Sequence, residues 1–318
     1  MTKTYDVVVV GGGAAGLSAA LTLSRARRSV LVVDAGEPRN APAAGVHGFL
    51  SRDGVPPAEL LAAGQDEVLR YGGEVLVGSA TGARRTGGGF EISVDAQTVR
   101  GRRLLVTTGL VDELPDIPGL RERWGRDVLH CPYCHGWEVR DQAIGVLAAG
   151  PLSVHQAQLF RQWSADVRLF THTHEAPAGE ELEQLQARGI AVVPGKVVEV
   201  VIQGEHLAGV RLADGAVVRI GALVIGARMA ARSEVLDSLG VEATDLVQAD
   251  HVVGSYVAAD PTGLTSAPGV WVAGNVADLR AQVMTAAADG VKVGAAINAD
   301  LIQQEIDEAV QRLRALAS

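Results

Sequence analysis

The stretch Val7-Val8-Val9-Val10-Gly11-Gly12-Gly13-Ala14-Ala15-Gly16 stands near the start of the 318-residue chain and decides its fold. Its four valines form an apolar run, which predicts a strand buried on both faces, as in a parallel sheet. Residues 17–28 are rich in Ala and Leu and predict a helix, and residues 29–34 predict a second strand. The glycines therefore lie at the strand-to-helix turn of a βαβ unit.

The three glycines of this G-x-G-x-x-G pattern have separate roles at a dinucleotide site. Gly11 permits the tight turn, Gly13 lets the backbone approach a pyrophosphate, and Gly16 lets the helix pack closely on the strand. The helix N-terminus offers N–H groups and partial positive charge to the phosphates. Asp34 ends the second strand and can accept hydrogen bonds from the ribose hydroxyls of an adenosine. We predict an FAD or NAD site here, with a structural turn that binds no ligand as the alternative.

A second βαβ pattern follows roughly 135 residues after the first. Residues 143–148 and 166–170 predict strands, and residues 154–163 predict the helix between them. The Pro-rich stretch 114–119 separates the two patterns. The fold class is therefore α/β, with two Rossmann-like domains of the three-layer FAD/NAD type.

Composition and charge exclude several classes of protein. The chain is 47% hydrophobic and 20% charged, which excludes a disordered or collagen-like chain. A formal net charge of -9 argues against nucleic acid or an anionic membrane surface as a partner. We find no targeting segment and no run of about 18 uncharged apolar residues, so we expect a soluble cytoplasmic protein.

The chain has two cysteines, Cys131 and Cys134, in the sequence Cys131-Pro132-Tyr133-Cys134-His135-Gly136-Trp137-Glu138. A C-x-x-C pair at a helix start has a lowered thiol pKa and therefore a reactive thiolate. Zinc is a weaker interpretation because four ligands are needed, and only His130 and His135 stand nearby. A structural disulfide is also weak because it closes a loop of two residues. We expect a redox-active pair and no metal site.

The chain resembles the low-molecular-weight thioredoxin reductase family along nearly its whole length. The resemblance rests on the first glycine turn, on residues 107–109, on the C-x-x-C pair and on the block 273–290. It implies an FAD domain built from both chain ends, residues 1–113 and 244–318. It also implies an inserted NADPH-like domain, residues 114–243, that carries the dithiol. Family members are usually homodimers.

The resemblance also implies which residues serve each part of the site. Cys134 is the sulfur nearer the flavin, Cys131 exchanges with the substrate, and His135 occupies the position of the usual acidic residue and assists proton transfer. For His135 and His130 a packing or surface role is the alternative. His47 is a candidate contact on the flavin side, with a packing role as the alternative. The expected FAD contacts are Gly11, Gly13, Ala14, Ala15, Gly16, Asp34, Ala35, Asn40, His47, Thr108, Gly109, Asn275, Gln282 and Val283. Asn275 departs from the family's Asp, but it can still bond a ribityl hydroxyl.

The second turn departs further from the family pattern. Residues 148–153 read Ala-Ala-Gly-Pro-Leu-Ser, where a working reductase has G-x-G-x-x-A. Ala148 adds a Cβ at the tight turn, and Pro151 removes a backbone N–H near the phosphate position. The strand that ends at residue 170 is followed by Thr171-His172-Thr173, without the family's arginines for NADPH. We predict a degraded NADPH site, with a divergent but working site as the alternative.

These departures resemble the branch of the family that oxidises dithiols, including the holomycin, gliotoxin and romidepsin types of antibiotic and toxin biosynthesis. The resemblance implies an FAD-dependent dithiol oxidase that closes a disulfide in a small natural product. Oxygen is then the electron acceptor and hydrogen peroxide the product. One alternative is a disulfide reductase driven by NADPH or ferredoxin. The other is a redox sensor in which FAD is structural.

Overall fold

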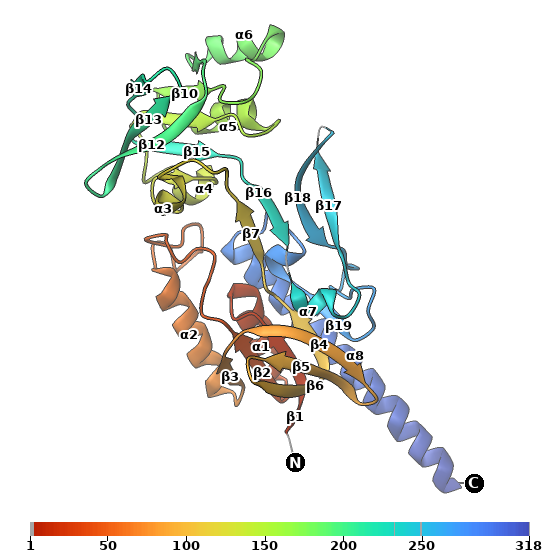
Figure 1. Ribbon diagram of the computed structural model, residues 1–318. Coiled ribbons are helices and arrows are strands. Elements are labelled where there is room, and N and C mark those ends of the chain that lie inside the picture. The colour runs from red at the N-terminus through yellow and green to blue at the C-terminus, as the bar shows by residue number, and fades with distance from the viewer. Residues whose placement is uncertain (1–2, 232, 249, 318) are drawn as a thin grey trace.

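The computed structural model describes residues 3–231, 233–248 and 250–317 and shows two units, each built on a sheet with helices beside it (Figure 1). The first unit is built on a sheet of strand order β3-β2-β1-β6-β5-β4, with β19 beside β6. Its elements are β1 Thr4–Val10, α1 Ala14–Arg25, β2 Val30–Asp34, α2 Pro57–Arg70, β3 Glu74–Val77, β4 Ala80–Thr86, β5 Gly89–Val94, β6 Gln97–Val106, β19 Val270–Val272, the 3-10 helix η1 Gly274–Val276 and α8 Val283–Ala317.

The second unit is built on a parallel sheet of order β11-β10-β9-β15-β8, with an antiparallel sheet β12-β13-β14 beside it. The predicted second βαβ pattern is confirmed as β9, α5 and β10, with β9 and β10 parallel. Its elements are α3 Leu120–Arg123, β8 Val128–Leu129, α4 Pro132–His135, β9 Ile144–Leu147, α5 Ser153–Phe160, β10 Val167–Phe170, α6 Gly179–Ala187, β11 Ala191–Val193, β12 Val197–Gln203, β13 His206–Leu212, β14 Val217–Val218 and β15 Ala222–Ile225.

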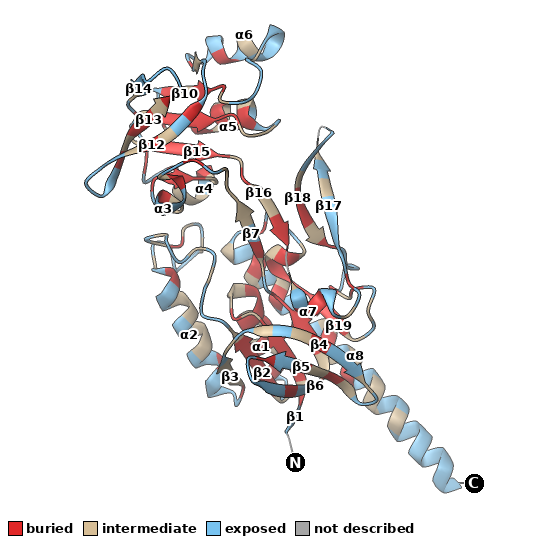
Figure 2. Ribbon diagram, viewed as in Figure 1, coloured by how far each residue is buried: buried red, intermediate tan, exposed pale blue. Residues whose placement is uncertain are grey.

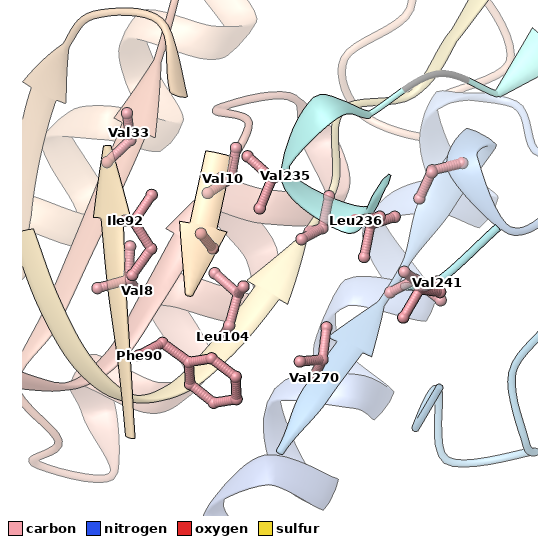
Figure 3. Packing of buried hydrophobic residues seen from close by; sticks show 14 of the residues in the cluster. Val8, Val10, Val33, Phe90, Ile92, Leu104, Val235, Leu236, Val241 and Val270 are labelled. Carbon is pink, nitrogen blue, oxygen red and sulfur yellow. The ribbon is translucent and has the colours of Figure 1, made fainter. Parts of the chain in front are cut away.

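The predicted strand through Val7–Val10 lies at the centre of the first sheet, between β2 and β6, and parallel to both. All four valines are buried, which explains the uninterrupted apolar run. Val8 and Val10 enter one core cluster, and Val7 and Val9 enter the other on the opposite face. Figure 2 shows the buried centre of this sheet, and Figure 3 shows the packing around Val8 and Val10.

Two strands carry the chain between the units. Strand β7, Leu110–Glu113, leads out of the first unit, and β16, Arg228–Ala231, returns antiparallel beside it. Strands β17 Ala243–Gln248 and β18 His251–Val257 complete that sheet. Arg228 Nη1 donates to Glu113 Oε2 at 2.9 Å across the β7–β16 pair. The second unit is therefore inserted between two segments of the first.

The chain returns to the first unit before residue 244, the expected start of its second segment. Helix α7, Glu234–Asp237, lies against β4, and Val235, Leu236 and Val241 belong to the same core cluster as Val8 and Val10 (Figure 3). Ala231 and residues of the segment 233–243, all expected in the inserted domain, thus pack with the first unit. The short apolar pattern of this segment did not reveal which core it joins. Residues 1, 2 and 318, at the outer ends of the expected FAD domain, lie outside the described residues.

Helix boundaries differ from the expected ones at several ends. Helix α1 begins at Ala14, three residues before the predicted start, because the glycine turn itself supplies the N-cap. Residues 299–317 form the second half of a long helix, α8, which begins at Val283. Gly87 and Gly88 connect β4 to β5, which pair antiparallel.

Helices α1 and α8 pack together through small residues. A Cβ added at Gly290 of α8 would lie 2.1 Å from the backbone oxygen of Ala15 in α1. A Cβ at Gly274, just after β19, would lie 2.8 Å from Cβ of the same alanine. The start of α1 and the carboxy-terminal segment therefore meet at a distance that only glycine allows.

We expect Gly290→Ala to separate α1 from α8, because the added methyl group meets backbone that cannot move aside. The free energy of unfolding should fall by about 1–3 kcal/mol, as measured by urea denaturation. Gly64→Ala in α2 is the matched control, because a Cβ there meets only the end of the Leu17 side chain, at 3.1 Å. Equal unfolding midpoints for Gly290→Ala and the wild type would contradict this packing.

Candidate active site

One cavity of about 760 Å³ joins the first glycine turn to the two cysteines. It is lined by residues of both units, including Thr107 beside the turn and His130 before the dithiol. All the expected cofactor and catalytic residues line it except Gly16 and Gln282: Gly11, Gly13, Ala14, Ala15, Asp34, Ala35, Asn40, His47, Thr108, Gly109, Cys131, Cys134, His135, Asn275 and Val283. The fold thus places segments that lie roughly 270 residues apart in the sequence around one cavity.

The glycine turn leaves room and N–H donors at the start of α1. Gly13 is the N-cap, so no side chain covers the first N–H groups of the helix, and a Cβ built at Gly13 meets nothing within 4 Å. Gly16 has a different role, because a Cβ there would lie 1.9 Å from the backbone oxygen of Gly11. Gly16 therefore lets the helix start against the strand end, as predicted from the motif, and Gly13 faces the cavity. This uncapped helix start fits a pyrophosphate.

Two polar side chains shape the ends of this space. Asp34 Oδ1 accepts a hydrogen bond from the Gly12 N–H at 2.8 Å, which holds the carboxylate beside the turn. Asn275 Nδ2 donates to the backbone oxygens of Asp278 and Ala281, at 2.9 and 2.8 Å. Both N–H donors of Asn275 are thus engaged with the loop before α8, and an Asp could not make these bonds. The Asn275 carbonyl oxygen is the atom that can accept from a ribityl hydroxyl.

The two cysteines form a disulfide at the start of α4. Cys131 is the N-cap of this helix, and its Sγ accepts from the Cys134 N–H at 3.2 Å. Gln282, an expected FAD contact, instead points its Nε2 toward Cys131 Sγ, at 4.0 Å. The segment before α8 therefore contacts the dithiol as well as the cavity. Both cysteine residues are only partly buried, and both line the cavity.

His135 follows the second cysteine and has a lowered pKa. Burial is the main cause, and neighbouring His47 lowers the pKa further, while the Glu138 carboxylate acts in the opposite direction. A lowered pKa keeps the imidazole neutral at physiological pH, so His135 can accept a proton there.

His47 links the loop after β2 to the dithiol helix region. Its Nε2 lies 3.4 Å from Glu138 Oε1, and its Nδ1 lies 3.5 Å from Asp53 Oδ2. His47 lines the cavity as expected, and it also joins the first unit to the segment that carries the cysteines. Sequence reasoning missed Glu138 as a partner because that pairing depends on how the two units meet, and it also missed Asp53, which lies only six residues along the same loop.

His130 has a different environment. Its Nδ1 lies 3.2 Å from the Ile225 backbone oxygen, and its own backbone oxygen accepts from Gln156 Nε2 at 3.1 Å. Burial lowers its pKa. The ring is therefore held against β15 and lines the cavity from the second unit.

The backbone groups of the second turn are hydrogen-bonded to a side chain of the same turn. Ser153 Oγ accepts from the N–H groups of Ala149 and Gly150, at 3.2 and 3.3 Å, and donates to the Gly150 oxygen at 2.7 Å. After β10, Thr171 Oγ1 accepts from the Gly195 N–H at 3.3 Å, and His172 Nδ1 accepts from the Val197 N–H at 3.2 Å. The groups expected near a nucleotide are thus bonded within the second unit. The Ser153 cap was recognisable in principle, since a serine follows the glycine by three residues.

A cavity that joins a G-x-G-x-x-G turn to a disulfide fits a flavin-dependent disulfide oxidoreductase. The chain belongs to the pyridine nucleotide-disulphide oxidoreductase family, whose model matches residues 5–290. It is an oxidoreductase of the thioredoxin reductase type, and its cofactor is FAD. The predicted fold class and the resemblance to thioredoxin reductases are confirmed.

Relatives and solved structures agree with this assignment. The chain is 34% identical over 257 residues to thioredoxin reductase tcpT of Claviceps purpurea, covering 76% of this chain and 79% of the relative. It is 29% identical over 313 residues to thioredoxin reductase sirT of Leptosphaeria maculans, covering 92% and 93%. The crystal structure of HlmI has 44% identity and a TM-score of 0.92, covering 100% of this chain and 99% of HlmI. An oxidoreductase from Agrobacterium tumefaciens has 36% identity and a TM-score of 0.87, covering 94% and 99%.

Neither a membrane-spanning helix nor a group of metal-ligating side chains occurs in the part of the chain that the structure describes. Across residues 3–231, 233–248 and 250–317, no helix is both long and apolar enough to cross a membrane. In the same described residues, no three His, Cys, Asp or Glu side chains are grouped so that they could hold a metal ion.

We expect Gly13→Ala to fold normally but to retain less FAD. The backbone φ of -77° suits alanine, and the added methyl group enters open space on the cavity side of the turn. The fraction of purified protein that carries flavin, measured by absorbance, should fall, while the unfolding midpoint of flavin-free protein should stay unchanged. The matched variant Gly16→Ala should instead unfold the first unit. Full flavin content in Gly13→Ala would contradict a pyrophosphate at this turn.

We expect Glu138→Gln to lower the pKa of His135 further, because it removes the charge that favours the protonated ring. The pKa can be followed by NMR titration of the imidazole C–H signals. His130 is the internal control, because burial, Ile225, Arg39 and Asp112 set its pKa and Glu138 does not. An unchanged or raised His135 pKa would show that the carboxylate does not act on the ring.

Proposed function

We propose that this protein is an FAD-dependent oxidase of small dithiols, which closes an intramolecular disulfide in a natural product with O2 as acceptor and H2O2 as product. The observation that carries the proposal is the contrast between the two glycine turns. In the first turn the N-cap Gly13 makes no side-chain hydrogen bond, whereas in the second turn Ser153 Oγ accepts from the N–H groups of Ala149 and Gly150. A protein that binds FAD without NADPH needs another electron donor, and a dithiol can be that donor.

Residues 171–173, which follow β10 and include no arginine, support the same proposal. Thr171, His172 and Thr173 stand where the family resemblance places arginines for the 2′-phosphate of NADPH. Thr171 and His172 accept hydrogen bonds from the segment between β11 and β12, so they hold the second unit together. Displacing Ser153 would leave buried donors and acceptors unpaired, and that would add a cost to nucleotide binding.

Aromatic side chains around the disulfide favour a small, partly apolar substrate. Tyr133 lies between the cysteines in sequence and is 66% exposed, and Trp137 is 65% exposed. The Trp137 ring is held by the Arg140 guanidinium, 4.1 Å from the ring centroid. Rigid aromatic surfaces beside a reactive disulfide can bind a flat dithiol without a large conformational cost.

The exchange steps use Cys131, Cys134 and His135. A substrate thiolate attacks Cys131 Sγ, forms a mixed disulfide, and releases Cys134 as a thiolate. The second substrate thiol loses its proton to neutral His135 and attacks the substrate sulfur of the mixed disulfide. The cyclic disulfide leaves, and the enzyme holds two reduced thiols. Because both substrate thiols belong to one molecule, the second step is intramolecular and therefore favoured over attack by a separate thiol.

The cavity residues named above would hold FAD, with the pyrophosphate at Gly13 and the start of α1, and the adenosine ribose at Asp34. When bound, FAD would supply the two-electron redox chemistry that couples the reduced Cys131 and Cys134 to O2. Residues 1–113 and 244–318 are proposed to form the FAD domain together with the returning segment 228–243. The cytoplasm, where substrate thiols stay reduced, is the proposed compartment.

The proposal predicts that a small dithiol drives O2 uptake and peroxide formation, while NADPH does not bleach the flavin. Cys131→Ser and Cys134→Ser should each abolish turnover and keep full flavin absorbance. His135→Ala should slow turnover about 10²-fold or more, since it removes the proton acceptor. Glu59→Gln, a change at an exposed carboxylate of α2, is the control.

Rapid bleaching by NADPH without dithiol-driven O2 uptake would overturn the oxidase and favour the NADPH-dependent reductase. Flavin reduction by reduced ferredoxin, again without dithiol-driven uptake, would favour the ferredoxin-dependent reductase. FAD that no donor reduces through the cysteines would favour a redox sensor.

A further inference from the structure

Gln156 of α5 is a buried polar residue whose side chain is only half satisfied. The residue is 8% exposed. Its Nε2 donates to the backbone oxygen of His130 at 3.1 Å. Its Oε1 is also buried and has no hydrogen-bond partner among the described residues. An unpartnered buried oxygen costs free energy of folding, so a glutamine at this position calls for a reason other than stability.

The hydrogen bond from Gln156 acts on the peptide unit that joins His130 to Cys131. Because a peptide unit is planar, fixing the orientation of the His130 carbonyl also fixes the Cys131 N–H and the position of the Cys131 Cα. The His130 ring is held at the end of β15, since its Nδ1 lies 3.2 Å from the Ile225 backbone oxygen. The residue before the dithiol is therefore held through both its backbone and its side chain.

Helix α4, which begins within the dithiol, needs support from outside. It has only four residues, Pro132–His135, and a helix this short does not persist on its own. At its start, the Cys134 N–H donates to Cys131 Sγ at 3.2 Å. In the proposed exchange this sulfur changes its own bonding, so the bond to it cannot keep the dithiol in place through every step.

The other end of α4 lies against Trp163, which follows α5. A Cβ added at Gly136 would lie 2.8 Å from the Trp163 ring, and the Tyr133 ring meets that ring edge-on, with the centroids 5.7 Å apart. Phe160, the last residue of α5, also lies beside the Trp163 ring, with 6.1 Å between the centroids. Helix α5 and the residues after it thus contact the dithiol segment on both sides of the two cysteines.

We propose that Gln156 is a positioning residue for the thiol–disulfide exchange at Cys131. Over the described residues, the cavity lining includes both cysteines and His130 but not Gln156, so Gln156 acts through the His130 carbonyl rather than on the substrate. Exchange requires the incoming sulfur and Cys131 Sγ to meet in a defined geometry, and a displacement of about 1 Å can slow a reaction about 10²-fold. The inference rests on the exchange steps of the proposed function, but not on O2 as the acceptor.

The test measures how fast dithiothreitol delivers electrons to the flavoprotein in the absence of O2. These electrons are counted as bleached flavin and as thiols trapped by N-ethylmaleimide and detected by mass spectrometry, since the chain has no cysteines beyond this pair. Gln156→Met keeps the length of the side chain but removes the donor to His130. The limiting rate should fall about 10-fold or more. The dithiothreitol concentration at half-maximal rate should stay unchanged, because the cavity lining is intact.

Gln158→Met is the matched control on the same helix. Gln158 Nε2 donates to Gln184 Oε1 of α6 at 3.0 Å, so this variant loses a side-chain hydrogen bond without affecting the His130 carbonyl. Its limiting rate should equal that of the wild type. Gln156→Met should keep the wild-type unfolding midpoint, because it removes one unpartnered oxygen and leaves the His130 oxygen without this donor.

Gln156→Glu separates positioning from packing through its pH dependence. Burial raises the pKa of a carboxyl group at this position, and the protonated form can donate to the His130 oxygen. The ratio of the variant's limiting rate to the wild-type rate should therefore rise as the pH is lowered from about 8 to about 6. The thiolate fraction falls in both proteins over this range and cancels in the ratio.

A Gln156→Met variant as fast as Gln158→Met would overturn the proposal. A change confined to the half-maximal dithiothreitol concentration, or a Gln156→Glu ratio that does not depend on pH, would also overturn it. If Gln156→Met does not fold, the pH series of Gln156→Glu decides alone. A wild type that exchanges rapidly with dithiothreitol but consumes no O2 in air would contradict the proposed oxidase alone, because the positioning test needs no O2.

Discussion

The contact between Gly16 and the backbone oxygen of Gly11 is the constraint on which the site depends. A single added carbon at Gly16 would lie 1.9 Å from that oxygen, so the start of α1 is pressed directly against the end of β1. This contact orients the first N–H groups of the helix toward the cavity. Ala15, next to Gly16, is in a similar position, because a Cβ at Gly274 or at Gly290 would overlap with its atoms. The amino-terminal turn therefore positions the carboxy-terminal segment that completes the cofactor site.

The two βαβ units share one architecture but differ in the hydrogen bonds of their strand-to-helix turns. In the first unit a glycine caps the helix and leaves its donors open. In the second unit Ser153 accepts from the N–H groups of Ala149 and Gly150, in the turn before α5. The proposed change of electron donor thus rests on a local difference in hydrogen bonding and leaves the βαβ architecture unchanged.

The dithiol depends on contacts from both units. Cys131 and Cys134 belong to the second unit, but Gln282 and His47 reach their surroundings from the first. His135 has its pKa set by burial at this junction and by charges on both sides of it. The chemistry of the cysteines is therefore a property of the way the units meet, and β7 and β16 hold that arrangement through Arg228 and Glu113.

The sequence by itself determined the α/β class, both βαβ units, the dinucleotide turn and the reactive cysteine pair, because each depends on residues close together in the chain. It also predicted a weakened second turn through Ala148 and Pro151, whereas the Ser153 bonds appear only in three dimensions. Tertiary structure alone decided that Ala231 and residues of the segment 233–243 pack with the first core, that His47 meets Glu138, and that Gln282 faces a sulfur. These features join segments far apart in the chain, and pairings across such distances depend on packing rather than on local pattern.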